Sequence, residues 1–246
     1  MTVSNPVFVH AGTARPGDLV TVAGPEGRHG AAVRRLRPGE PVDLVDGAGG
    51  RATGTVADVT RDAFTVRVDA VSHEPERRPR LVVVQALAKG DRAEAAVETL
   101  TECGVDEIVP WAAYRSVAVW RGAKVDRGPD RWRAVARAAA KQSRRSRFPV
   151  IGALATSAAV AERLRGAAAG LVLHETAPHS LARVDVPRDG DVVVVVGPEG
   201  GIDDGELAQF AAAGAQQVRL GPTVMRTSTA GTAAVAALSA ASGRWE

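Results

Sequence analysis

The sequence predicts an α/β protein in which a small β-barrel precedes a larger α/β domain. Three observations support this: short strand-like segments fill residues 1–73, a polar joint rich in proline follows (EPERRPR, 74–80), and long apolar strands then alternate with helices. We therefore divide the 246-residue chain into a small β-barrel at 1–73 and an α/β domain at 74–246.

The N-terminal segment reads as short strands with one helix. Its last strand alternates Phe64, Val66 and Val68 with polar residues, which is the period of a half-buried strand. A helix is expected at about 28–36, and Asp46-Gly47 reads as a hairpin turn. The strands expected are 7–10, 19–22, 41–45, 52–58 and 63–71. Several short strands with a single helix indicate a small barrel.

The C-terminal segment alternates buried-type strands with helices. The run VVVVV is the clearest strand, because a strand covered on both faces is apolar throughout. Such alternation predicts a mostly parallel sheet, whose ligands bind at the carboxyl ends of the strands. The loops after Leu173, Val196 and Leu220 are therefore the expected site. The strands expected are 81–87, 107–111, 171–174, 192–196 and 217–220, and the helices are about 91–103, 130–143, 157–166, 204–213 and 229–241.

Two of these loops suit close approach by a ligand. The loop at 197–201 (GPEGG) leaves backbone groups bare, and Glu199 is its only charge, although a plain strand-to-helix turn is the alternative. In the next loop, Arg226 precedes hydroxyl residues that start a helix, where Ser228 or Thr229 could be a plain N-cap. A cation is unfavourable beside the positive end of a helix dipole. This misfit favours a functional Arg226, directed at a carboxylate, a phosphate or developing negative charge.

Composition and motifs argue against several classes of function. The single Cys103 excludes a disulfide framework, and His174 with Glu175 lacks a third ligand, so no metal is expected. The string at 47–52 fits a dinucleotide fingerprint, but a strand and not a helix follows it. The sequence shows neither a signal peptide nor 18 consecutive apolar residues. We therefore expect a cytoplasmic protein without membrane contact.

The net charge of +3 hides a basic centre. Residues 75–185 carry a net +7, against −1 for 1–74 and −3 for 186–246. Within the centre, 131–147 holds seven bases and no acid. Such a run indicates contact with a polyanion such as RNA, since like charges repel unless a partner neutralises them; a solvated helix face is the alternative. The candidates for RNA contact are Arg34, Arg35, Arg133, Arg137, Lys141, Arg144, Arg145 and Arg147.

Four strings in one order carry a family resemblance: LVVVQALAKGDRAEAAVETLTECGVDEIVPWAAYRSV, RAAAKQSRRSRFPVI, VVVVVGPEGG and LGPTVMRTSTAGTAA. They resemble the SPOUT methyltransferases, specifically the bacterial 16S rRNA (uracil-N3)-methyltransferase family. The segment 33–47 also resembles the PUA-like barrel of that family. The resemblance implies S-adenosylmethionine as methyl donor, 16S rRNA or the small ribosomal subunit as partner, a homodimer, and a deep trefoil knot in the C-terminal domain.

The resemblance also implies roles for single residues. Arg226 is the catalytic candidate for stabilising negative charge on uracil, and Glu199 is a candidate base or cofactor contact. The family usually has Glu where this chain has Ser228, and many members have an Arg before the first aromatic, which Pro6-Val7-Phe8 lacks. The cofactor-binding residues implied are Leu173, His174, Glu175, Gly197, Pro198, Glu199, Gly200, Gly201, Leu220, Gly221, Met225, Arg226, Thr227, Ser228, Thr229 and Ala230.

Two alternatives remain open at this stage. The chain could be a SPOUT enzyme that methylates another RNA position or a ribose 2′-hydroxyl. It could also be an RNA-binding protein whose catalytic domain is inactive.

Overall fold

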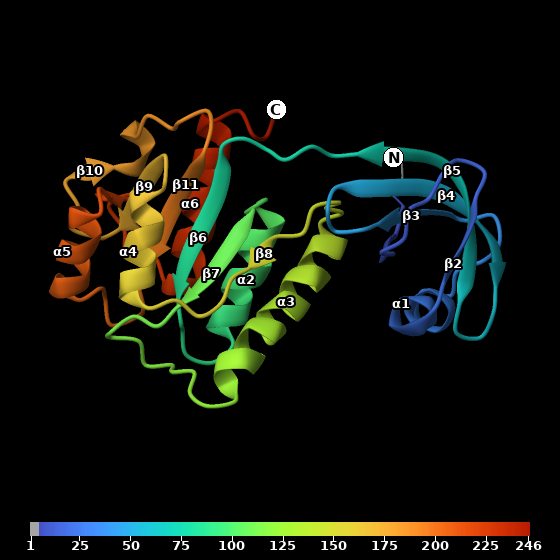
Figure 1. Cartoon of the computed structure of the whole chain (residues 1–246), viewed down its shortest axis with the longest axis horizontal. Coiled ribbons are helices and arrows are strands. Elements are labelled where there is room, and N and C mark those ends of the chain that lie inside the picture. The colour runs from blue at the N-terminus through green and yellow to red at the C-terminus, as the bar shows by residue number, and fades with distance from the viewer. Residues whose placement is uncertain (1–4) are drawn as a thin grey trace. The chain divides into compact units, whose positions relative to one another are not determined.

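The computed structural model describes residues 5–246 and divides the chain into two units (Figure 1). The smaller unit comprises the chain up to Glu76 together with Ala140–Phe148, and the larger comprises Arg77–Ala139 and Pro149–Glu246. Residues 1–4 of the expected N-terminal domain lie outside the described residues. One of the boundaries between the two units, after Glu76, falls within the joint at 74–80.

The smaller unit is built on a five-stranded sheet. Its strands are β1 (Val7–Val9), β2 (Leu19–Val22), β3 (Pro41–Val45), β4 (Gly50–Val59) and β5 (Phe64–His73), so all five expected strands are present. They lie in the order β1-β3-β4-β5-β2, and every pair is antiparallel except β1 with β3. The turn predicted at Asp46-Gly47 joins β3 to β4, and Gly47 has a φ of +81° there. Phe64, Val66 and Val68 are buried in the core of the unit, as their alternation predicts.

The helix of the smaller unit begins earlier than the predicted 28–36. The observed α1 (Gly24–Arg28) passes into η1 (His29–Val33), a short π-helix. Pro25 lies in the first turn of α1, where its missing N–H costs no hydrogen bond. The string Gly24-Pro25-Glu26-Gly27 is therefore the start of a helix.

The larger unit contains a seven-stranded sheet. Its strands are β6 (Arg80–Ala86), β7 (Glu107–Trp111), β8 (Val150–Ile151), β9 (Ala169–Leu173), β10 (His179–Ser180), β11 (Asp191–Val196) and β12 (Gln216–Arg219). They lie in the order β10-β12-β9-β11-β6-β7-β8 and every pair is parallel, which confirms the predicted parallel sheet. β8 and β10 were not expected, because two residues show no periodicity.

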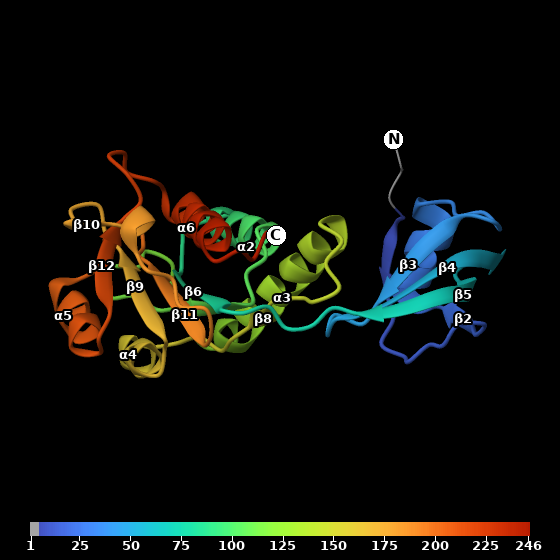
Figure 2. The same cartoon turned by 90° about the horizontal axis from the view of Figure 1, so that it is seen from above.

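Helices cover both faces of this sheet. They include α2 (Arg92–Glu102), α4 (Ser157–Arg165), α5 (Asp204–Ala212) and α6 (Thr227–Ala241), with the short 3₁₀ helix η2 (Leu181–Arg183) before β11. Figure 2 shows α2 and α6 together on one face and α4 on the other. Val194 packs in the cluster that contains Val97 of α2, and Val193 in the cluster that contains Phe210 of α5. Burial on both sides explains the uninterrupted valine run.

Two helices begin earlier than predicted. One was expected at about 130–143, and proline generally disfavours a helix interior. The observed α3 (Lys124–Gln142) nevertheless contains Pro129, which is buried in its second turn. The last helix, α6, begins at Thr227 with Arg226 as its N-cap residue, so the prediction of Ser228 or Thr229 as N-cap was wrong. Across residues 5–246, no helix combines the length and apolar character needed to cross a membrane.

Candidate functional site

Three loops at the carboxyl edge of the parallel sheet enclose a cavity of about 330 Å³. They follow β9, β11 and β12, which are neighbours in the order β12-β9-β11, so their carboxyl ends meet at one edge. The sequence-predicted residues that line the cavity are Leu173, His174, Glu175, Gly197, Pro198, Glu199, Gly201, Leu220, Gly221, Met225, Arg226, Thr227 and Ala230. The structure therefore brings together most of the predicted set.

Three predicted residues do not line this cavity. Gly200 lies against another loop, since a Cβ added there would be 3.0 Å from the Arg115 carbonyl oxygen. Thr229 donates its hydroxyl to the Arg226 carbonyl at 3.2 Å, and Ser228 is half-buried in the first turn of α6. Conversely, sequence reasoning missed Arg92, Val196, Ile202, Arg219, Thr223 and Val224. Arg92 could have been found, because β6 ends at the same edge and the helix that starts at Arg92 follows it after a short loop.

The cavity combines apolar side chains with exposed backbone. Leu173, Ile202 and Leu220 contribute apolar surface. A Cβ added to Gly197 would lie 2.6 Å from Ile202 Cγ1, and Gly201 has a φ of +76°, which L side chains rarely adopt. Glycine at both positions allows the chain to turn tightly beside the cavity.

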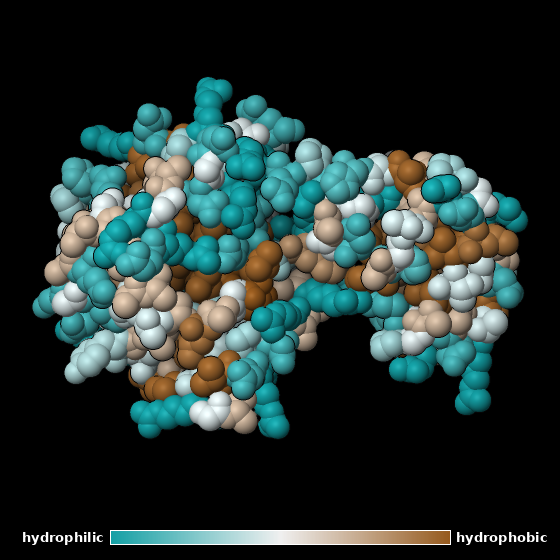
Figure 3. Space-filling model, viewed as in Figure 1, coloured by the Kyte–Doolittle hydropathy of each residue, from teal (hydrophilic) through white to brown (hydrophobic). Residues whose placement is uncertain are grey.

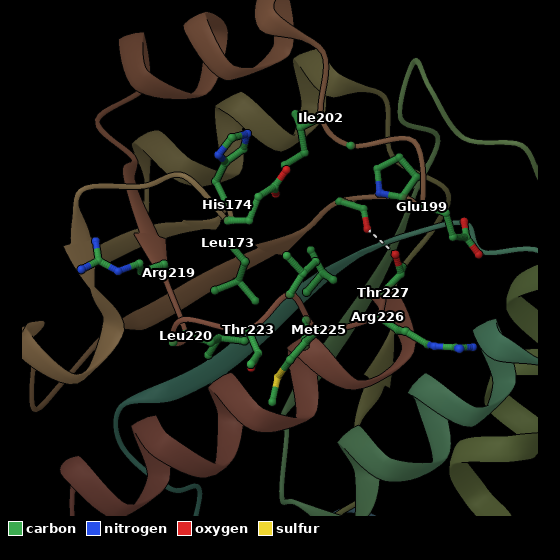
Figure 4. Close-up of a pocket in the computed structure, with 18 of the residues that line it drawn as sticks. Leu173, His174, Glu199, Ile202, Arg219, Leu220, Thr223, Met225, Arg226 and Thr227 are labelled. Atoms are coloured by element: carbon green, nitrogen blue, oxygen red, sulfur yellow. Dashed lines mark hydrogen bonds between the residues drawn. The ribbon is translucent and has the colours of Figure 1, made fainter.

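A chain of hydrogen bonds fixes the loops relative to one another. The Thr227 hydroxyl donates to the Gly197 carbonyl at 2.9 Å (Figure 4). Gln85 on β6 is fully buried, and its amide donates to the Thr227 carbonyl at 3.3 Å. The start of α6 is therefore held against the loop after β11 and against β6.

The two catalytic candidates lie at the same end of the cavity, and His174 and Arg219 lie at the other (Figure 4). Glu199 Oε1 accepts a hydrogen bond from the Lys89 backbone at 3.3 Å and lies 3.5 Å from Arg92 Nη1. The Arg226 guanidinium is exposed and has no polar partner within residues 5–246. Arg226 is thus available to a negatively charged group, whereas one oxygen of Glu199 is already occupied.

The other end of the cavity is held by local contacts. Arg219 Nη1 donates to the carbonyls of Ala177 and Pro178, each at 2.6 Å, and His174 Nδ1 lies 3.1 Å from the Thr176 hydroxyl. These contacts order the loop after β9. In the part of the chain that the structure describes, no group of three or more His, Cys, Asp or Glu side chains could hold a metal ion.

The basic run at 131–147 is partly neutralised by acids elsewhere in the chain. This neutralisation reduces the repulsion within the run, and contact with an external polyanion stays a prediction. The pairs are Arg131–Glu94 (2.6 Å), Arg133–Asp130 (2.6 Å), Lys141–Glu26 (2.8 Å) and Arg147–Glu76 (3.9 Å).

The RNA-contact candidates differ in their surroundings. Lys141 Nζ bonds both carboxylate oxygens of Glu26 at 2.9 and 2.8 Å, and the two side chains are only 18% and 17% exposed. Lys141 is thus mainly an internal contact of the smaller unit. The exposed candidates are Arg34, Arg35, Arg133, Arg137 and Arg144, and the half-buried ones are Arg145 and Arg147.

Comparisons with known proteins match both units. An RNA methyltransferase domain model matches residues 75–239, and an RNA methyltransferase PUA domain model matches residues 22–69. Ribosomal RNA small subunit methyltransferase E of Mycobacterium tuberculosis is 45% identical over 234 residues, which cover 94% of this chain and 89% of that protein. The protein of the same name in Bacillus subtilis is 26% identical, with 89% of each chain covered.

A solved structure has the same architecture over almost the whole chain. Ribosomal RNA small subunit methyltransferase E from Neisseria gonorrhoeae, bound to S-adenosyl methionine, is 25% identical. It matches with a TM-score of 0.85 and covers 96% of this chain and 98% of its own.

Proposed function

Because this chain belongs to the RNA methyltransferase family that includes ribosomal RNA small subunit methyltransferase E, we propose that it methylates N3 of one uridine in 16S rRNA with S-adenosylmethionine as methyl donor. One observation carries the proposal. A cavity with apolar walls and glycine-rich backbone lies at the carboxyl edge of the sheet, with the unpaired Arg226 at one end.

The residues of the cavity fit this methyl donor. Leu173, Ile202 and Leu220 would hold an adenine ring and a thioether by apolar contact, and the bare backbone of 197–201 offers hydrogen-bonding groups. Thr227 and Gln85 keep these walls in place before any ligand binds. When bound, S-adenosylmethionine supplies an electrophilic methyl group.

The side chains at the reactive end fit methylation of a weakly acidic nitrogen. Uracil N3 must lose its proton, which leaves negative charge on the carbonyl oxygens of the base. The unpaired guanidinium of Arg226 stabilises this charge. Glu199 is the candidate proton acceptor, because its Oε2 has no partner within residues 5–246, while contacts to Lys89 and Arg92 hold Oε1 in place.

The family resemblance supports three further parts of the proposal. The protein acts as a homodimer, its cofactor loops form a trefoil knot, and it works on ribosomal RNA in the cytoplasm. Light scattering of the purified protein tests the dimer, and a monomer at micromolar concentration would contradict it.

The decisive experiment maps the methylation of 16S rRNA in a strain that lacks the gene. Mass spectrometry should show the loss of one base-methylated uridine, which a plasmid copy of the gene restores. Methylation at N3 also blocks Watson–Crick pairing, so a stop of reverse transcription at that uridine should vanish in the deletion strain.

Two other outcomes would point to the alternatives. Loss of a ribose methyl group, or of a methyl group at another base position, would identify a different RNA specificity. Unchanged rRNA together with no binding of S-adenosylmethionine in calorimetry would indicate an inactive domain.

A further inference from the structure

A second cavity of about 420 Å³ lies next to the first, within the larger unit. The first turn of α2 borders both cavities: Arg92 lines the first, whereas Ala93 and Glu94 line the second. The loop before α2 also borders both cavities. Gly90 lines the second cavity, and the backbone N–H of Lys89 donates a hydrogen bond to Glu199 in the first. The first helical turn of α2 therefore lies between the two cavities.

The second cavity has an aromatic wall. Trp120 and Trp132 meet edge to face with their ring centroids 5.4 Å apart, and Trp132 is 2% exposed. Gly128 of α3 lets the helix backbone approach the indole, because a Cβ added there would lie 2.5 Å from the Trp120 ring. The wall is thus a supported aromatic surface of the kind on which a nucleobase stacks.

The same cavity carries an excess of positive charge. Among the described residues that line it, three are cations (Lys124, Arg127 and Arg131) and Glu94 is the one acid. Glu94 pairs with Arg131 at 2.6 Å, whereas Lys124 and Arg127 are exposed and have no carboxylate partner within residues 5–246. Two cations therefore remain to hold an anionic group at the cavity.

The surrounding surface is mixed in character. Figure 3 shows hydrophobic and hydrophilic residues interspersed at the lower end of the larger unit, where Figure 1 places the segment between β7 and α3. Val119 and Val125 are 49% and 40% exposed. Apolar surface interleaved with cations is typical of a site for single-stranded nucleic acid, which presents bases and phosphates alternately.

We propose that this second cavity binds a nucleotide of the rRNA that neighbours the target uridine, with its base on Trp120 and its phosphate held by Lys124 and Arg127. The inference rests on the proposed function, since the target uridine must reach the end of the first cavity where Arg226 and Glu199 lie. To expose N3 the target base has to leave its stack, and a nearby site that holds the adjoining nucleotide stabilises the extruded chain. The single turn between the cavities makes this arrangement possible for one RNA strand.

Charge reversal tests the phosphate contacts. The double variant Lys124→Glu/Arg127→Glu should raise KM for small subunits from the deletion strain by about tenfold or more, and should lower the salt slope of binding by about 1 to 2. Its affinity for S-adenosylmethionine in calorimetry should not change. The control is Arg183→Glu/Arg188→Glu, which makes the same charge change at two exposed arginines that line neither cavity. Equal effects in the two variants would overturn the proposal.

Stacking is tested at Trp120. Trp120→Leu should weaken rRNA binding by roughly tenfold, whereas Trp120→Phe should keep most of the affinity, and neither should change the salt slope. Because Trp120 also packs on Trp132, photocrosslinking of the unaltered protein provides a second measurement. Small-subunit RNA with 4-thiouridine beside the target should crosslink to the peptide that contains Trp120. Crosslinks confined to other peptides would overturn the inference.

The two proposals fail in different ways. If the unaltered protein leaves 16S rRNA unmethylated, the proposed function fails. If it methylates the rRNA while the Lys124, Arg127 and Trp120 variants behave like the control, only the second cavity loses its role.

Discussion

Arg226 differs from the other arginines of the first cavity in having no side-chain partner among the described residues 5–246. Arg92 lies beside Glu199, and Arg219 donates to two backbone carbonyls, so both have a structural role already. Arg226 is the N-cap residue of α6, yet its side chain makes no cap bond. A cation at the positive end of a helix is unfavourable, which supports the proposal that Arg226 serves the substrate.

We predict that Arg226→Ala lowers kcat by roughly a hundredfold, as removal of a donor to developing negative charge does. The melting temperature should stay unchanged because the side chain is exposed, and the affinity for S-adenosylmethionine should change little. Arg226→Lys should recover part of the rate. Single-turnover methylation with saturating cofactor measures the effect, and a full rate in the Ala variant would exclude the role of Arg226.

Cys103 offers a prediction about pH. Burial raises the pKa of its thiol, and the neighbouring charge of Glu102 raises the pKa further. A raised pKa means less thiolate at a given pH, so iodoacetamide should alkylate the native protein more slowly near neutral pH than the urea-unfolded chain. The pH at which alkylation becomes fast should also be higher in the native protein. Mass spectrometry of timed samples measures both, and equal pH profiles would contradict the prediction.

At the scale of elements, Glu206 ties the segment after β7 to α5. It is buried, and its Oε1 accepts from the Tyr114 backbone at 2.9 Å and from the Ser157 hydroxyl at 2.6 Å. Its Oε2 completes a capping box with Asp203 at the start of α5. The Glu206 carboxylate therefore connects three segments: the loop after β7, the start of α4 and the start of α5. The loop after β7 is also the segment that lies against Gly200.

We predict that Glu206→Ala lowers the free energy of unfolding by about 2 to 3 kcal/mol, because it leaves buried donors without an acceptor. Hydrogen exchange should increase at 112–117. Asp204→Ala is the matched control, since Asp204 is an exposed acid in the same first turn. A loss of stability no larger than that of the control would show that Glu206 is not an anchor.

Lys141 yields a second prediction at this scale. Its pair with Glu26 is mostly buried, and Lys141 Nζ lies 5.9 Å from the Phe8 ring centroid. Lys141→Ala should cost about 2 kcal/mol of stability, the scale of a hydrogen bond to a charged group. Arg34→Ala, at an exposed position, should cost almost nothing. Urea unfolding of the two variants and of Glu26→Gln compares them, and equal stabilities would contradict the internal role.

At the scale of the whole molecule, the smaller unit is discontinuous in sequence. Residues 140–148 belong to it through backbone hydrogen bonds from Gly49 to Ser146 (3.0 Å) and from Phe148 to Gly47 (2.9 Å). Arg51 also donates to the Arg144 carbonyl at 2.7 Å. The domain limits expected from sequence, 1–73 and 74–246, treat each domain as one continuous segment. The smaller unit of the structure instead combines two segments of the chain.

We predict that a chain starting at residue 77 loses order in 140–148 but keeps its parallel sheet. Its hydrogen exchange should be much faster at 140–148 than in the full chain, because the bonds to Gly47 and Gly49 are gone. The central strand β11 should stay protected in both. Equal protection of 140–148 in the two chains would contradict the assignment of this segment to the smaller unit.

Much of the fold follows from local pattern. Period-two alternation revealed β5, and the valine run revealed β11, because each pattern reports which faces of a strand are buried. The rule that ligands bind at the carboxyl ends of parallel strands then located the three loops and, with them, Glu199 and Arg226. The predicted starts of helices were less accurate. A proline was expected to precede a helix, whereas Pro25 lies inside α1 and Pro129 inside α3, each near the N-terminal end.

Local sequence pattern was enough to predict the parallel sheet, the loops that enclose the first cavity and the residues that these loops carry. Which distant groups meet became visible in the folded structure alone. Glu26 lies 115 positions from Lys141 and Glu199 lies 107 from Arg92, yet each pair is in contact. Trp120 and Gly90 come together around a second cavity for the same reason. Local periodicity reports which way a side chain faces, whereas an ion pair or a cavity depends on distance in space, which the packing of remote segments sets.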